Sequence, residues 1–184
     1  MRTNSLILVF VFLTALSAGA QKFITKTGYI KFYSDASLEK IAAHNRQVNC
    51  ALDAATGDFI FRVLMKSFEF EKALMQEHFN ENYVESDKYP NATFLGKITN
   101  IKDIILTKDG TYNANVEGKL TIHGVTNNVK EKGTFEVRQG KLIGKAKFNI
   151  VVADYKITIP GTVGNNISKT VEITVDVTLD KANM

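Results

Sequence analysis

Apolar and polar residues alternate along the second half of this chain. From Tyr112 to Ile122, apolar or small residues occupy every second position, and polar residues fill the positions between them. Because successive side chains of a strand point to opposite faces of the sheet, this alternation predicts a half-buried β-strand. The same pattern returns over residues 129–137, 142–152 and 171–179. The sequence therefore predicts four consecutive strands in this half.

Less regular strand candidates precede them, over residues 24–33, 41–52, 59–68 and 92–101. They bring the expected total to about eight strands. Short turn sequences lie between candidates: "ATGD" at 55–58, "KDG" at 108–110 and "RQG" at 138–140. Such connections are typical of antiparallel hairpins. Residues 153–168 include Pro160, Gly161 and Gly164, so a longer irregular connection is expected there.

Antiparallel strands with one apolar face form either a sandwich or a closed up-and-down barrel. An eight-stranded barrel is either filled by its own side chains or holds one small ligand. Small residues recur in the apolar register: Gly28, Gly96, Ala114, Gly118, Gly133, Gly144 and Ala146. In a plain core such a set leaves voids, which favours a ligand cavity. The alternative interpretation is that the glycines mark bulges and barrel corners.

Residues 69–90, "EFEKALMQEHFNENYVESDKYP", do not alternate. They predict one helix between the third and fourth strands. Ser67 is a candidate N-cap, and Glu69 and Glu71 suit the positive end of the helix dipole in the first turn. Pro90 marks the outer limit of this helix.

The apolar face of the predicted helix is broad. Met75, Phe79 and Tyr83 recur every fourth residue, and Phe70 and Leu74 make a second pair with the same spacing. Such a face must cover something apolar, and the open mouth of a barrel meets that need. We therefore expect Met75 and Phe79 to be lid residues that face a cavity.

The chain begins with the three-part pattern of a secretory signal peptide. Arg2 precedes an apolar run over residues 6–16, and small residues follow up to Ala20. We expect cleavage before Gln21, which leaves residues 21–184 as one domain and places the mature protein in the periplasm or outside the cell. A retained anchor is the alternative, but the apolar run is short for a bilayer span, and no second apolar segment follows it.

Charge and cysteine content exclude several classes of protein. The formal net charge is +4, and the basic residues are spread along the chain rather than gathered in a stripe, which argues against nucleic-acid binding. Cys50 is the only cysteine, so no intrachain disulfide holds the fold. Burial of apolar side chains must therefore supply the stability, and no stable membrane insertion of the mature chain is expected.

Candidate chemistry is sparse. The histidines His44, His78 and His123 show no metal-ligand spacing, and Cys50 has no evident histidine partner. In "KDGTYNANVEG", the oxygen ligands and the glycine do not fall at the positions that a calcium loop requires, and "PGTVGNN" lacks the Lys-Ser or Lys-Thr pair of a phosphate-binding loop. We expect no catalytic residue, no metal and no cofactor. An enzyme would require His78, His123 and a carboxylate to converge in one pocket.

Three segments resemble a known family. They are residues 71–98, which contain the "YP-x-x-x-F" stretch of Tyr89, Pro90 and Phe94; residues 116–137, which contain "GKLTIHGVT"; and residues 146–160. In this order they resemble the YceI family over nearly the whole mature chain. The resemblance implies an extended, lipocalin-like barrel of eight antiparallel strands in an exported bacterial protein. It also implies that the barrel binds a polyisoprenoid or a similar long amphiphilic lipid. A departure from the family pattern is "DYKI" at 154–157.

The leading hypothesis is a non-enzymatic carrier of a long-chain isoprenoid or similar amphiphilic lipid. The candidate ligand-binding residues are Phe32, Phe61, Met65, Met75, Phe79, Phe94, Tyr112, Val116, Phe135, Phe148 and Ile150. The second hypothesis is a filled barrel that acts through its outer surface, as a structural or stress-associated interaction module. The sequence leaves monomer and homodimer open.

Overall fold

The computed structural model describes residues 21–161 and 164–182. The predicted signal peptide, residues 1–20, lies outside the described residues. No helix within the described part of the chain is both long and apolar enough to cross a membrane.

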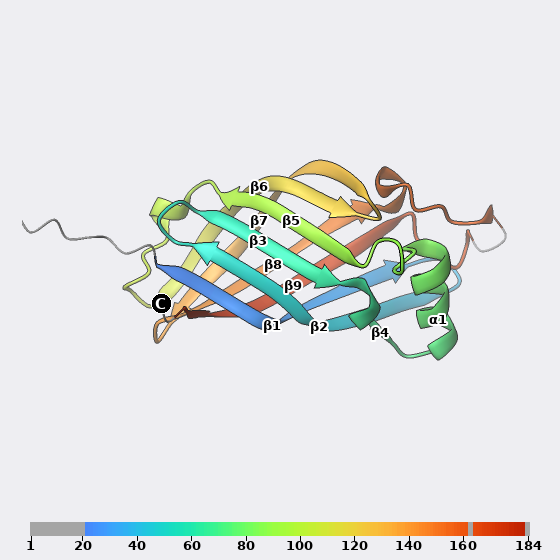
Figure 1. The fold of residues 1–184 in the computed structure, drawn as a ribbon, viewed down its shortest axis with the longest axis horizontal. Coiled ribbons are helices and arrows are strands. Elements are labelled where there is room, and N and C mark those ends of the chain that lie inside the picture. Colours follow the sequence, from blue (N-terminus) through green and yellow to red (C-terminus); the bar gives the residue numbers. More distant parts are fainter. Residues whose placement is uncertain (1–20, 162–163, 183–184) are drawn as a thin grey trace, which may run out of the picture.

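The described chain forms one antiparallel sheet that closes on itself (Figure 1). Its strand order is β1-β9-β8-β7-β6-β5-β3-β2-β4, and a further pairing between β1 and β2 completes an eight-stranded barrel, to which the two-residue β4 is added. The predicted up-and-down barrel is therefore confirmed. The strands are β1 (Lys22–Asp35), β2 (Lys40–Asp53), β3 (Asp58–Leu64), β4 (Glu69–Phe70), β5 (Asn91–Ile98), β6 (Gly110–Ile122), β7 (Val125–Arg138), β8 (Lys141–Val151) and β9 (Thr170–Lys181).

Strand β7 begins earlier than the predicted strand over residues 129–137. Ile122 pairs with Val125, so a two-residue turn of His123 and Gly124 joins β6 to β7. Both turn residues have positive φ, 50° and 73°, as the tight turns of hairpins require. Between β8 and β9 the described residues hold no strand, in agreement with the predicted long connection.

The helix is much shorter than the predicted span of residues 69–90. Helix α1 covers Ala73–His78 and continues as one π-helical turn, η2 (Phe79–Tyr83). Before it, a 3₁₀ turn, η1 (Met65–Ser67), leads into β4. Glu69 pairs with His44 of β2, so its backbone is extended rather than helical.

The predicted N-cap is also wrong. Helix α1 begins after Lys72, and no side chain caps it. Ser67 instead donates a hydrogen bond from Oγ to Oε1 of Gln47, over 3.1 Å. Sheet pairing of β4 with β2 determines the backbone here and overrides the local helix signal.

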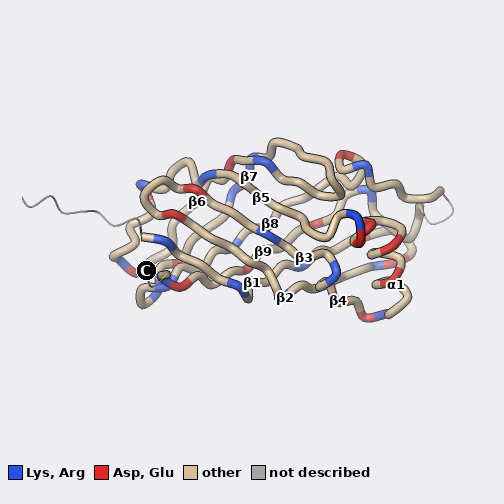
Figure 2. The backbone as a smooth tube through the Cα atoms, in the orientation of Figure 1, with Lys and Arg blue, Asp and Glu red and all other residues tan. Residues whose placement is uncertain are grey.

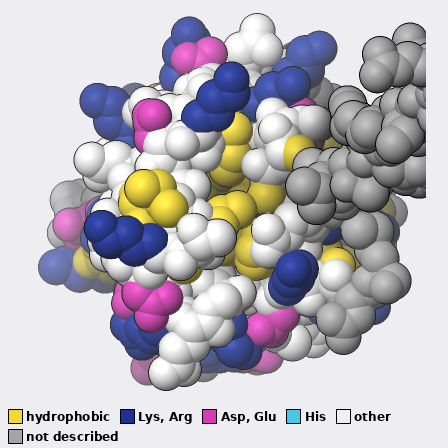
Figure 3. All heavy atoms as spheres, turned by 90° about the vertical axis from the view of Figure 1, so that its left-hand side faces the viewer, with side chains coloured by type: hydrophobic (Ala, Val, Ile, Leu, Met, Phe, Trp, Pro, Cys, Tyr) yellow, Lys and Arg dark blue, Asp and Glu magenta, His cyan; other side chains and the backbone are white. Residues whose placement is uncertain are grey.

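The buried core lies in two clusters. One closes the end of the barrel at which β1 begins and β9 ends, and its most buried members include Phe23, Leu52, Ile98, Leu142 and Leu179. The other lies towards α1 and includes Ile30, Ala43, Val63, Met65 and Phe68. Seen from the first end, apolar side chains are visible at the centre, with charged residues around them (Figure 3).

Three glycines of the inner face, Gly96, Gly118 and Gly144, lie against aromatic rings. Gly96 pairs directly with Gly118, and a Cβ added to Gly118 would lie 2.8 Å from Cζ of Phe94. A Cβ on Gly144 would lie 2.9 Å from Cε1 of Phe135. The space at these glycines is therefore filled, and the sequence argument that they leave voids is wrong for them.

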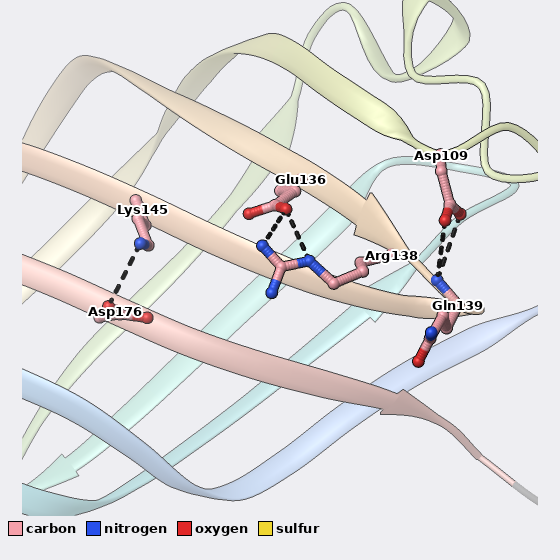
Figure 4. Close-up of polar contacts among 6 residues, drawn as sticks. All are labelled: Asp109, Glu136, Arg138, Gln139, Lys145 and Asp176. Atoms are coloured by element: carbon pink, nitrogen blue, oxygen red, sulfur yellow. Dashed lines mark hydrogen bonds and ion pairs between the residues drawn. The ribbon is translucent and has the colours of Figure 1, made fainter.

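The outer wall is a mixture of charges (Figure 2). Figure 4 shows two examples. Lys145 of β8 lies 3.8 Å from Asp176 of β9, and the Asp109 carboxylate accepts a hydrogen bond from the backbone N–H of Gln139 over 3.2 Å. Such exposed pairs contribute little to stability, and they place acidic residues among the basic ones on the described strands.

Candidate functional site

The barrel encloses an apolar cavity of about 390 Å³. All eight barrel strands contribute inward-facing side chains to its wall. The cavity extends from Phe59 and Phe135, at the edge of the packed end, to Met75 and Phe79 of the helical segment. Its volume lies within the range of small-molecule binding sites.

All but one of the predicted ligand-binding residues line this cavity: Phe32, Phe61, Met65, Met75, Phe79, Phe94, Val116, Phe135, Phe148 and Ile150. Tyr112 does not. It packs against the core cluster at the closed end, and its hydroxyl donates to the Lys108 carbonyl over 2.9 Å. Alternation correctly places Tyr112 on the inner face, but it carries no information on depth along the barrel.

The helical segment covers one end of the cavity through an aromatic cluster. The Phe79 ring stacks on Phe32 at 5.4 Å and packs against Phe68 at 5.6 Å and Phe70 at 5.1 Å. Leu74, the predicted partner of Phe70, is 61% exposed instead. Phe70 belongs to β4 rather than to the helix, so the two residues do not share a helix face.

Several polar groups in or beside the cavity have protein partners. Ser34 accepts a hydrogen bond from the Ser168 amide over 2.8 Å. Buried Asn45 donates to the Leu64 carbonyl and accepts from the Gln47 amide. At the mouth, Lys72 lies 2.9 Å from Glu39, and its hydrogen bond lowers the pKa of that carboxyl. These contacts hold strands and loops together.

Glu131 is different. It occupies an inward position on β7 between Val129 and Gly133, opposite Val116 of β6, and lines the cavity. Burial raises the pKa of its carboxyl, with no hydrogen bond or opposite charge from the described residues to offset the shift. The sequence analysis did not identify this residue, although it follows Val129 by two positions and therefore shares its inward strand face.

Glu131 lies where two strands part. The ladder between β7 and β8 ends at the pair of Gly133 and Ala146, whereas β7 stays paired with β6 up to Val125. A 3₁₀ turn, η4 (Val152–Tyr155), packs against the unpaired part of β7, where Asn127 donates to the Asp154 carbonyl over 2.9 Å. The fork of β7 and β8 is therefore bridged by η4.

The histidines serve separate contacts. His44 meets the Tyr29 hydroxyl at 2.7 Å, and His123 lies between Oε2 of Glu85 at 2.6 Å and the Tyr155 carbonyl at 3.1 Å. His78 lines the cavity, but His123 does not. The convergence that an enzyme would require is thus not present at these residues. Within residues 21–161 and 164–182, no group of three or more His, Cys, Asp or Glu could hold a metal ion.

Solved structures with the same fold are available for comparison. A polyisoprenoid binding domain from Saccharophagus degradans, implicated in plant cell wall breakdown, superposes with a TM-score of 0.77 at 14% identity, over 89% of this chain and 99% of that one. BcnA of Burkholderia cenocepacia gives 0.67 at 17% identity, over 83% and 95%. The YCEI protein of Campylobacter jejuni gives 0.55 at 15% identity, over the full length of both chains.

At these identities the structural likeness supports the fold alone. No curated protein sequence matches the chain significantly. The sequence profile of the YceI-like domain, however, matches residues 21–179, which includes every barrel strand except the last two residues of β9. The chain therefore belongs to the family of YceI-like domains.

Proposed function

We propose that this protein binds a long-chain, isoprenoid-type lipid inside its barrel and sequesters or carries it. The observation that carries the proposal is the apolar cavity of about 390 Å³, walled by all eight strands and covered by Phe79 and Met75. Burial of hydrocarbon contributes about 0.8 kcal/mol per CH₂, so a partly enclosed tail is enough to offset the ordering cost of binding.

The chemistry of the cavity and one structural relative support a lipid as the ligand. The wall is formed mainly by Phe, Ile, Val and Met side chains, with few polar groups. The Saccharophagus degradans domain of the same fold is described as polyisoprenoid binding. Such a wall offers affinity for hydrocarbon but no arrangement of nucleophile, base and acid, which supports a binding protein rather than an enzyme.

Export is part of the proposal. Arg2, the apolar run over residues 6–16 and the small residues up to Ala20 form the pattern of a cleaved signal peptide. We place the mature protein in the periplasm or outside the cell, where a carrier can shield a hydrocarbon chain from water. The unfilled cavity supports this function over the filled-barrel alternative.

Extraction of the purified protein tests the proposal. The protein is purified from its native compartment, its bound molecules are extracted into organic solvent, and mass spectrometry identifies and counts them. One long-chain lipid per protein chain is the expected result. A protein that carries no lipid, and that takes up none when offered isoprenoid lipids, would contradict the proposal.

A further inference from the structure

Glu131 is the single Asp, Glu, Lys or Arg that lies on an inward strand position among the described residues. The buried polar side chains Ser34 and Asn45 are satisfied by backbone groups. The Glu131 carboxyl has no such partner within the described part of the chain and faces the cavity. Glu131 is only partly buried, and its carboxyl, unlike the hydrocarbon side chains around it, can accept a hydrogen bond. Glu131 is thus a polar contact that the cavity offers to its contents.

The position of Glu131 fits one end of an elongated ligand. It is the first inward residue of β7 beyond the ladder that ends at Gly133 and Ala146. From there to Phe135, at the packed end, the only inward residue of β7 is Gly133, which lies against the Lys145 backbone and the Ala146 side chain of β8. In the other direction, apolar side chains continue to Phe79 of the lid. A ligand whose polar head group contacts Glu131 can therefore place its hydrocarbon tail along the apolar wall towards the lid.

The charges around this position disfavour an anion. Lys130 and Lys132 flank Glu131 in sequence, but adjacent side chains of a strand point to opposite faces. Both are exposed on the outer wall, where Lys130 lies 3.1 Å from Glu117. Asp154 of η4 adds a second carboxylate on the neighbouring element. Lys132 and Lys145 are among the residues that line the cavity, but both occupy outward strand positions, and Lys145 lies 3.8 Å from Asp176 on the outer wall. A phosphate inside would therefore meet no inward lysine or arginine of the described strands and would be repelled by an ionised Glu131.

We propose that Glu131 is the head-group contact of the cavity and that it selects an amphiphile with an uncharged hydrogen-bond donor, an alcohol or an amide, over one that ends in phosphate. The inference rests on the proposed lipid-binding function. In either protonation state the carboxyl accepts a hydrogen bond from such a donor. The raised pKa extends the pH range over which it also donates one.

Two ligands with the same hydrocarbon chain test the selection: geranylgeraniol and geranylgeranyl phosphate. The affinity of each ligand is measured by its displacement of the uncharged fluorescent dye N-phenyl-1-naphthylamine from the delipidated protein. We expect the wild-type protein to bind the alcohol at least about 10-fold more tightly than the phosphate, the size of one good hydrogen bond. Glu131→Leu should weaken alcohol binding about 10-fold, with the dye affinity of each variant measured directly so that displacement gives the affinity for the alcohol.

Glu131→Gln and Glu117→Gln complete the test. Glu131→Gln keeps a hydrogen-bonding group without the charge, so it should retain the alcohol and bind the phosphate about 10-fold more tightly than wild type. Glu117 lies on the outer wall of the neighbouring strand β6, so Glu117→Gln is the matched control and should change neither affinity.

Several results would overturn the inference. One is a wild-type protein that prefers the phosphate; another is a Glu131→Leu protein that binds the alcohol as tightly as wild type. If Glu131→Leu fails to fold, Glu131→Gln is sufficient for the test: a Glu131→Gln protein with the same preference for the alcohol over the phosphate as wild type overturns the inference. Equal binding of both ligands refutes head-group selection while the lipid-binding function stands. If neither ligand nor the dye binds, the proposed function fails together with this inference.

Discussion

Two phenylalanines of the inner face show how different the roles of similar residues are. Phe135 is 2% exposed and packs at 5.7 Å against Phe59, at the edge of the closed end. Phe148 is only partly buried and lines the cavity wall beyond the end of the β7–β8 ladder. Both alternate with polar neighbours and both line the cavity, but Phe135 is packed into the core at the cavity's edge, whereas Phe148 lies on the more open part of the wall. A charge should therefore have a different effect at each position.

Phe148→Asp is expected to abolish lipid retention while the barrel still folds. The new carboxylate faces open space instead of packed side chains, so it can be hydrated, but it opposes an apolar tail. Extraction and mass spectrometry measure the retained lipid, and circular dichroism with thermal melting checks the fold. Asn149→Asp, one residue along on the outer face, is the control and should retain lipid. Undiminished lipid in a folded Phe148→Asp protein would refute this role, whereas Phe135→Asp is expected not to fold.

Glu131 should make stability depend on pH. Its folded pKa is raised by burial above the ordinary value of 4.5, so the protonated form is favoured in the folded state. Its contribution to stability is complete below about pH 4.5 and is lost as pH rises through the raised value. Glu131→Gln should remove this loss and give a higher free energy of unfolding at pH 7. Urea unfolding at a series of pH values measures it, and parallel profiles for the two proteins would contradict the prediction.

Cys50 should be inert in the folded protein. It is 4% exposed, and burial raises the pKa of its thiol, so the reactive thiolate is suppressed. Iodoacetamide at pH 8 should leave the native protein unmodified and should alkylate the urea-unfolded protein completely, as mass spectrometry can show. Rapid alkylation of the native protein would mean that the strand around Cys50 opens readily.

At the scale of elements, the segment that follows the helix, residues 84–90, contacts the turn of the β6–β7 hairpin. His123 lies 2.6 Å from Glu85 and 3.1 Å from the Tyr155 carbonyl, so it joins the post-helical segment to η4. Tyr89 packs edge-on against His123 at 4.7 Å. The "YP" and "IHGVT" motifs, far apart in sequence, thus form one contact.

Gly124 should be needed for that contact. Its φ is +73°, and an added Cβ would lie 2.5 Å from Cε1 of Tyr89. Gly124→Ala therefore combines backbone strain with a clash, and we expect a loss of about 1–3 kcal/mol in the free energy of unfolding. Gly140→Ala is the matched control, because Gly140 has a φ of +78° but nothing within 4 Å of an added Cβ. Urea unfolding of both variants separates clash from strain; equal losses would show that Tyr89 moves aside freely.

For the whole molecule, alternation was sufficient to predict antiparallel strands and the face on which most strand residues lie, but it left a sandwich and a barrel open, and the resemblance to the YceI family was needed to choose the barrel. Alternation could not predict depth along the barrel, which is why Tyr112 was assigned to the cavity although it packs at the closed end. The helix was predicted too long because pairing of Glu69 with β2 is a contact distant in sequence. Glu131 was overlooked because a charged residue in an alternating strand is normally assigned to the polar face, whereas its position in the register places it inside.

The position of β9 has a consequence for the order of folding. This last strand pairs with β8 on one side and with β1 on the other, so it joins the two ends of the chain. Until Thr170–Lys181 has been synthesised and has reached the rest of the chain, β1 and β8 each expose an unpaired edge. The barrel therefore closes last through its most distant contacts, which makes slow folding the expectation. Any hydrocarbon held inside becomes fully enclosed only after the final strand is in place.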